Sequence, residues 1–182
     1  MLVPGTTINS NCLITITSGT ADVANTSVNG LLRVNFSLTG DMANFISLNY
    51  SDDNPIYVYK CSTSDGMTDT NKVARLIKAE DGNFYLVGTD VTSIQLNTTL
   101  YEIPCKANNG EVSLMFDLSF AVNNLSTDGE TIFENGFSGK TVEFKADFIV
   151  IQSEFYDSTL GNDPLPQTYR YAKDIFDAPA GL

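Results

Sequence analysis

The stretch VSLMFDLSFAV, residues 112–122, decides the fold class. Its apolar side chains recur at every second position, with mostly small or polar residues between them. Side chains of a β-strand point alternately to the two faces of a sheet, so this period of two indicates a strand with one face in the core and one in water. The stretch VEFKADFIV, residues 142–150, repeats the pattern. Both are typical of antiparallel sheets.

Shorter runs of alternating or β-branched residues surround these two stretches. They predict further strands over residues 13–17, 32–38, 45–50, 56–61, 73–79, 84–87, 93–96 and 100–105. Glycine, asparagine and aspartate lie between the runs, and Asp81-Gly82 supplies the positive φ of a tight hairpin. This spacing predicts an all-β fold: an antiparallel β-sandwich, jelly-roll or immunoglobulin-like, over residues 12–152.

The composition excludes several classes of function. The 182 residues include 10 Lys plus Arg, 22 Asp plus Glu and no His, which gives a net charge of −12. Without histidine there is no Ser-His-Asp or Cys-His nucleophile and no histidine-ligated metal, and no cofactor motif occurs. Because a negative surface repels phosphate backbones, we expect no nucleic acid partner.

We also expect no membrane partner, because no stretch approaches the roughly 20 apolar residues of a spanning helix. The residues after Met1 do not resemble a secretion signal. Two interpretations follow: the chain is made and used without export, or a signal was removed from it.

The three cysteines are far apart in the chain. Cys12, Cys61 and Cys105 have none of the close spacings of metal knuckles or redox motifs, so we expect buried thiols. Cys61 and Cys105 each end an apolar alternation, and they are the pair to consider if a disulfide forms.

Carboxylates are the one abundant group with catalytic or metal-binding chemistry. Asp52-Asp53 and Glu80-Asp81 lie in predicted turns, where solvated surface acids are favoured over a glycosidase pair. The loop at residues 64–71 carries oxygen atoms that suit calcium, but it lacks the spacing of an EF-hand, which favours an ordinary polar turn. We therefore predict no catalytic residue and no metal site.

Aromatic residues point instead to contacts with partners. Tyr57 and Tyr59 share one face of a predicted strand, where they either cover a second sheet or form an exposed contact patch.

After residue 152 the alternation stops, and residues 153–182 combine prolines with large apolar side chains. We predict an extended C-terminal arm that docks on its own domain or on a neighbouring subunit, through Phe155, Tyr156, Tyr169, Tyr171, Ile175 and Phe176. Residues 1–11 form a second candidate arm.

These features favour a non-enzymatic structural subunit of a virion, such as a phage or viral capsid, head-decoration or tail protein. Such a subunit assembles with itself or with neighbouring structural subunits through sandwich faces and terminal arms, and its location is the virion. The first alternative is a secreted fimbrial or adhesin-like subunit at the cell surface. The second is a carbohydrate-binding module, or a hydrolase with two catalytic carboxylates.

Overall fold

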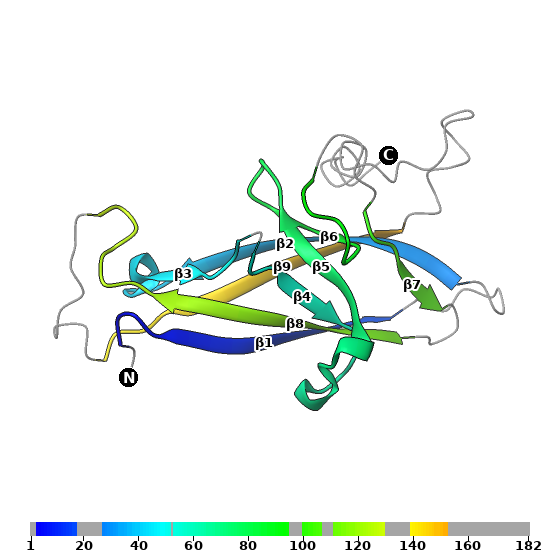
Figure 1. The fold of residues 1–182 in the computed structure, drawn as a ribbon, viewed down its shortest axis with the longest axis horizontal. Coiled ribbons are helices and arrows are strands. Elements are labelled where there is room, and N and C mark those ends of the chain that lie inside the picture. Colours follow the sequence, from blue (N-terminus) through cyan, green and yellow to red (C-terminus); the bar gives the residue numbers. More distant parts are fainter. Residues whose placement is uncertain are drawn as a thin grey trace.

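The structure, a computed structural model, describes residues 3–17, 27–51, 53–94, 100–106, 111–129 and 139–152. Nine strands and three short 3-10 turns lie in this part of the chain (Figure 1). The strands are β1 (Thr7–Thr17), β2 (Ser27–Thr39), β3 (Ile46–Leu48), β4 (Ile56–Tyr59), β5 (Lys72–Lys78), β6 (Phe84–Val87), β7 (Ile103–Lys106), β8 (Glu111–Val122) and β9 (Glu143–Gln152). The turns are η1 (Ala43–Phe45), η2 (Ser64–Gly66) and η3 (Asp69–Asn71).

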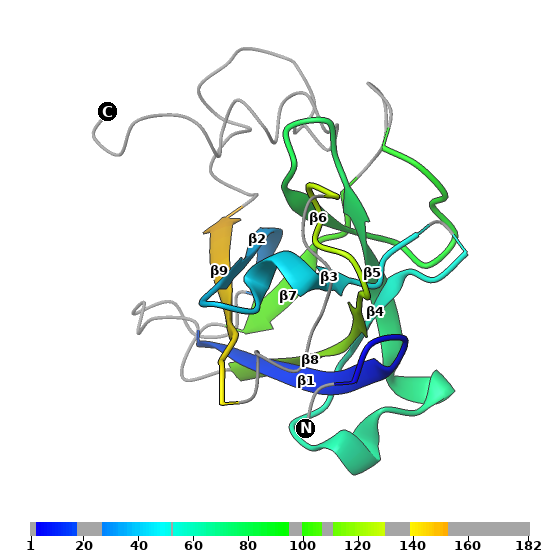
Figure 2. The same ribbon diagram turned by 90° about the vertical axis from the view of Figure 1, so that its left-hand side faces the viewer.

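All strand pairs are antiparallel, and hydrogen bonds join them into one sheet in the order β1-β8-β4-β5-β6-β2-β7. In addition, β3 pairs with β8, and β9 pairs with β2. The sheet curls into a half-barrel, which Figure 2 shows along its long axis, with the strands around a common interior. The prediction of an all-β, antiparallel fold is confirmed.

A division into two separate sheets, which defines a β-sandwich, is not confirmed. β6 pairs with β2 at Arg33↔Tyr85 and Val34↔Phe84, and this short ladder joins the two halves of the curl into one sheet. The long alternating runs could not reveal this pairing, because it involves only two residues of each strand.

The predicted strand positions agree well with the observed ones, with a few differences. β1 begins at Thr7, so residues 7–11 lie in a strand rather than in a separate N-terminal arm, because they continue the ladder with β8 as far as Thr7↔Ala121. Ser93 and Ile94 are not in a strand, and the rest of the strand predicted at 93–96 lies outside the described residues. The predicted hairpin at Asp81-Gly82 is present, with Gly82 at φ 84°.

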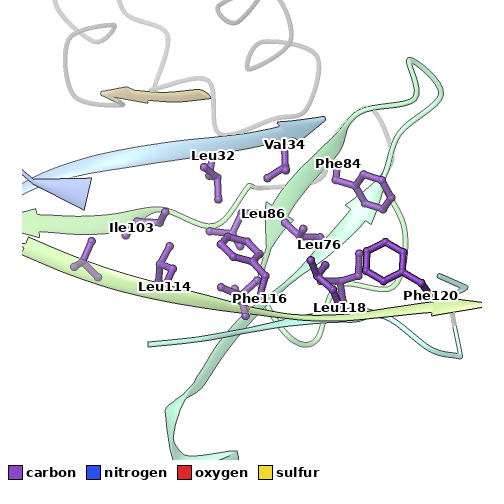
Figure 3. Close-up of a cluster of buried hydrophobic side chains, with 14 of the residues drawn as sticks. Leu32, Val34, Leu76, Phe84, Leu86, Ile103, Leu114, Phe116, Leu118 and Phe120 are labelled. Atoms are coloured by element: carbon purple, nitrogen blue, oxygen red, sulfur yellow. The ribbon is translucent and has the colours of Figure 1, made fainter. Parts of the chain in front are cut away.

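The main core fills the inside of the curl. It is built from the inward side chains of β2, β4, β5, β6 and β8, of which Leu32, Leu76, Phe84, Phe116 and Phe120 are examples in Figure 3. Rings from opposite halves meet there: the ring centres of Phe116 and Phe148 are 5.2 Å apart, and those of Phe120 and Phe144 are 4.9 Å apart. These aromatic contacts hold β9 against β8 across the interior.

A second, smaller core lies on the other face of the sheet. Its buried members are Leu31, Ile77, Tyr85, Val87 and Leu100. β5 and β6 are therefore covered on both sides, which explains why successive residues of β6 are all buried. None of the helices in the described ranges is long and apolar enough to cross a bilayer.

Candidate functional site

An aromatic pocket opens at the end of the half-barrel where β2 ends and β9 begins. Its volume is about 270 Å³. Residues of β2, β3, β6, β8 and β9 line it, together with Tyr50 and residues near the β5–β6 hairpin: Phe36, Ser37, Leu38, Leu48, Tyr50, Lys78, Gly82, Phe84, Phe120 and Phe144. Strand alternation places these phenylalanines on the inner face, and the curl of the sheet brings them together.

The rings of the pocket contact one another at tilted or edge-on angles. Phe36 lies 5.1 Å from Phe84 and 5.5 Å from Phe144, measured between ring centres. Tyr50 meets Phe84 edge-on at 5.1 Å. Phe84 is buried, whereas Phe36, Tyr50 and Phe144 are only partly buried. The pocket therefore has an aromatic wall with part of its surface open to solvent.

Lys78 provides the positive charge of the pocket. Its backbone N–H donates a hydrogen bond to the Tyr50 hydroxyl over 3.1 Å, which ties the end of β5 to the pocket wall. Its ammonium nitrogen lies 5.9 Å from the centre of the Phe84 ring, within cation–π range. Within the described ranges this ammonium group makes no ion pair with a carboxylate.

Among the described strands, β1 and β9 are long edge strands of the sheet. Among the described strands, β1 pairs only with β8, and β9 pairs only with β2. β1 contains no charged residue and no proline over its eleven residues, and Leu13 on its outer face is 45% exposed. Proteins usually protect free edges with lysine, proline or bulges, because unpaired N–H and C=O groups recruit another strand. β1 has none of these protections.

Two of the cysteines are free thiols, Cys12 and Cys61. Cys12 lies on the inner side of β1, and burial raises the pKa of its thiol, which keeps it protonated and unreactive at neutral pH. The Cys61–Cys105 disulfide considered from the sequence does not form. Cys105 lies in β7, opposite Val28.

The loop at residues 64–71 folds into the turns η2 and η3. Lys72 donates a hydrogen bond to Asp69 over 2.9 Å, and this bond lowers the pKa of the Asp69 carboxyl. Asn71 donates its side-chain N–H to the carbonyl of Gly66 over 2.8 Å. The Asp69 carboxylate and the Gly66 carbonyl therefore have internal partners. No cluster of three or more potential metal ligands from His, Cys, Asp and Glu occurs in the described part of the chain.

The acid pairs considered from the sequence do not converge on a cleft. Asp53, Glu80 and Asp81 are exposed, and Asp52 lies outside the described residues. Asp81 accepts hydrogen bonds from the Tyr85 hydroxyl over 2.8 Å and from the Asn83 backbone. The aromatic pocket has no carboxylate in its lining.

Tyr57 and Tyr59 lie beside Lys72, whose ammonium nitrogen is 4.3 Å and 6.0 Å from the two ring centres. Tyr59 is buried, at 8% exposure, and Tyr57 is partly buried. Burial raises the pKa of the Tyr59 hydroxyl, although Lys72 acts against this effect. This burial favours packing of Tyr57 and Tyr59 within the fold over an exposed contact patch.

The predicted partner-binding residues of the C-terminal arm, Phe155, Tyr156, Tyr169, Tyr171, Ile175 and Phe176, lie outside the described residues. The pocket itself was not predicted from the sequence. The alternation did place Phe36, Phe120 and Phe144 on apolar faces, but it gave no face for Phe84 and no signal of which strands face each other.

No family model, no curated protein and no solved structure matches this chain.

Proposed function

We propose that this chain is a non-enzymatic structural subunit that assembles with copies of itself or with neighbouring subunits, and that the assembly is a virion. The proposed class is a capsid, head-decoration or tail protein. The observation that carries the proposal is the free edge of β1, which is eleven residues long, without charge and without proline.

The charge distribution supports assembly through this edge. Two copies with a net charge of −12 repel each other, and a charged contact surface would add to that repulsion. Strand pairing along an uncharged edge gains main-chain hydrogen bonds without bringing like charges together. The curled sheet packs its inner side chains into one main core, and a body of this kind can present its strand edges to neighbours.

The proposal is tested by measuring the mass of the intact protein by light scattering over a range of concentrations. Leu13→Lys adds a charge to the β1 edge region, and we expect it to lower the assembled mass. Leu125→Lys is the matched control, because Leu125 is 46% exposed, compared with 45% for Leu13, and lies outside the named strands. Both positions are exposed, and surface changes usually alter folding stability by about 0.5 kcal/mol or less, which thermal unfolding of both variants checks.

Either of two results contradicts the proposal. The first is an intact protein that is monomeric at every concentration. The second is an assembly that responds equally to Leu13→Lys and Leu125→Lys.

The fimbrial or adhesin-like alternative draws on the same free edges, because such subunits accept a strand from a neighbour. A secretion signal at the start of the encoding gene would favour this alternative, and location on the cell surface would then replace the virion.

A further inference from the structure

We infer that the aromatic pocket is the docking site for Phe155 and Tyr156 from a second copy of this chain. The inference rests on the proposed function, and it names the contact through which one subunit holds the next. Phe36, Phe84, Phe120, Phe144 and Lys78 form the receiving side.

The size and chemistry of the pocket suit aromatic side chains. Its volume of about 270 Å³ lies just below the ~300–1,000 Å³ of typical small-molecule sites. Space for one or two side chains is therefore a better match than space for a cofactor. Aromatic rings prefer tilted or edge-on neighbours at ~4.5–7 Å, and the partly buried rings of Phe36 and Phe144 leave surface for such contacts.

The charge of Lys78 selects between the aromatic pairs of the C-terminal segment. Phe155 and Tyr156 lie between two acids in the sequence Glu154-Phe155-Tyr156-Asp157. Tyr169 and Tyr171 lie on either side of Arg170, which would repel Lys78. Since the ammonium group of Lys78 has no ion pair within the described ranges, it is available to a carboxylate that arrives with the aromatic rings.

The direction of β9 places the occupant on another copy. β9 runs from Phe144, at the pocket, to Gln152, and eight residues of strand at ~3.3 Å each separate them by about 26 Å. At its end, Gln152, the strand β9 points away from the pocket. A reversal takes at least a two-residue turn, so Phe155 of the same chain returns no further than about the level of Gln152.

The test compares the assembly of the intact full-length protein with that of four variants by light scattering. Phe155→Ala/Tyr156→Ala removes the inserted side chains, and we expect the dissociation constant to rise about 30-fold or more. Lys78→Glu should raise it about tenfold, and adding Glu154→Lys/Asp157→Lys to that variant should restore most of the loss. Lys60→Glu is the matched control, because Lys60 is also exposed but does not line the pocket, and it should leave the constant unchanged.

A mixing experiment tests contact between copies directly. Leu48→Trp fills the pocket but keeps the C-terminal segment, whereas Phe155→Ala/Tyr156→Ala keeps the pocket but loses its ligand. We expect each variant alone to have lost the contact through the pocket, and the mixture to regain it and to show a higher mass than either variant alone at the same total concentration. Thermal unfolding of each variant shows whether it is folded, and Lys78→Glu replaces Leu48→Trp if the tryptophan prevents folding.

The outcomes separate the two proposals. If the intact protein never assembles, the proposed function fails, and the docking site fails with it. If the intact protein assembles and the pocket and aromatic variants assemble equally well, only the docking site is overturned. A pocket filled by its own chain would appear as lower stability in Tyr169→Ala/Tyr171→Ala with unchanged assembly, which also overturns the inference.

Discussion

The contact between Phe116 on β8 and Phe148 on β9 is the sharpest test of how the two halves of the curl are joined. Phe116 is completely buried, and its ring centre lies 5.2 Å from that of Phe148 at an interplanar angle of 46°. Replacing a buried phenylalanine with alanine costs about 3–5 kcal/mol, because apolar contacts are lost and a cavity remains. For a chain of this length, Phe116→Ala should lower the melting temperature by roughly 6–20 °C.

A double-mutant cycle isolates the contribution of the ring contact itself. Because Phe148 is only partly buried, Phe148→Ala should cost less than Phe116→Ala. The loss in the double variant should fall short of the sum of the single losses by about 0.5–1.5 kcal/mol, the usual coupling of an aromatic pair. Urea unfolding followed by far-UV circular dichroism measures each value, at a concentration where light scattering shows monomers.

Leu100 supplies the control cycle. Leu100 is 1% exposed, but it belongs to the smaller core on the opposite face of the sheet, so it shares no partners with Phe148. Leu100→Ala and Phe148→Ala should therefore be additive within about 0.5 kcal/mol. Equal coupling in both cycles, or none between Phe116 and Phe148, would refute the claim that β9 is held on β8 by this contact.

Three further predictions concern the backbone, pH and a buried charge. Gly40→Ala should lower the free energy of unfolding, measured in urea, by more than Gly82→Ala does. Both glycines have positive φ, but a Cβ at Gly40 would lie 2.7 Å from the Thr141 carbonyl oxygen, whereas a Cβ at Gly82 would have no atom within 4 Å. Burial raises the pKa of the Cys12 thiol in the folded state, so the stability that the protonated thiol contributes is fully present below the pKa of the unfolded chain and is lost as pH rises through the folded pKa. The melting temperature should therefore fall above about pH 9, and it should fall less in Cys12→Ala. The buried Nε of Arg75 has no hydrogen-bond partner in the described part of the chain. Arg75→Met should therefore leave the free energy of unfolding in urea unchanged or raise it by about 1 kcal/mol, and a clear loss would contradict this.

The strands were largely predictable, because side-chain alternation is local. Residues 112–122 and 142–150 correspond closely to β8 and β9, and residues 32–38 lie within β2. The start of β1 was not predicted, because Asn9, Ser10 and Asn11 have low strand propensity. They are in a strand because β8 offers them a continuous ladder partner, from Asn9↔Ser119 to Asn11↔Asp117.

The order of the strands and the pocket were not predictable from these patterns. Alternation specifies which residues face inward, but not which strands become neighbours, and every pocket wall joins strands far apart in the chain. Phe36 meets Phe144 because β2 pairs with β9, and Phe120 meets Phe144 because the sheet curls. The role of Lys78 at the pocket could not be predicted, because an exposed lysine at the end of a strand is common in soluble proteins.

The positions of the pocket and of the end of β9 limit how copies can be arranged. The pocket lies at the beginning of β9, and the C-terminal segment leaves from its end, about 26 Å away. Two copies placed with their β9 strands antiparallel bring each C-terminal segment to the other's pocket, which gives a closed dimer. Copies placed head to tail along β9 leave one pocket and one segment free at the ends, and the assembly then grows into a ring or a filament. A mass that stops at two chains identifies the first arrangement. A mass that rises with concentration beyond two chains identifies the second, which gives the larger assembly that a virion component of the kind proposed would form.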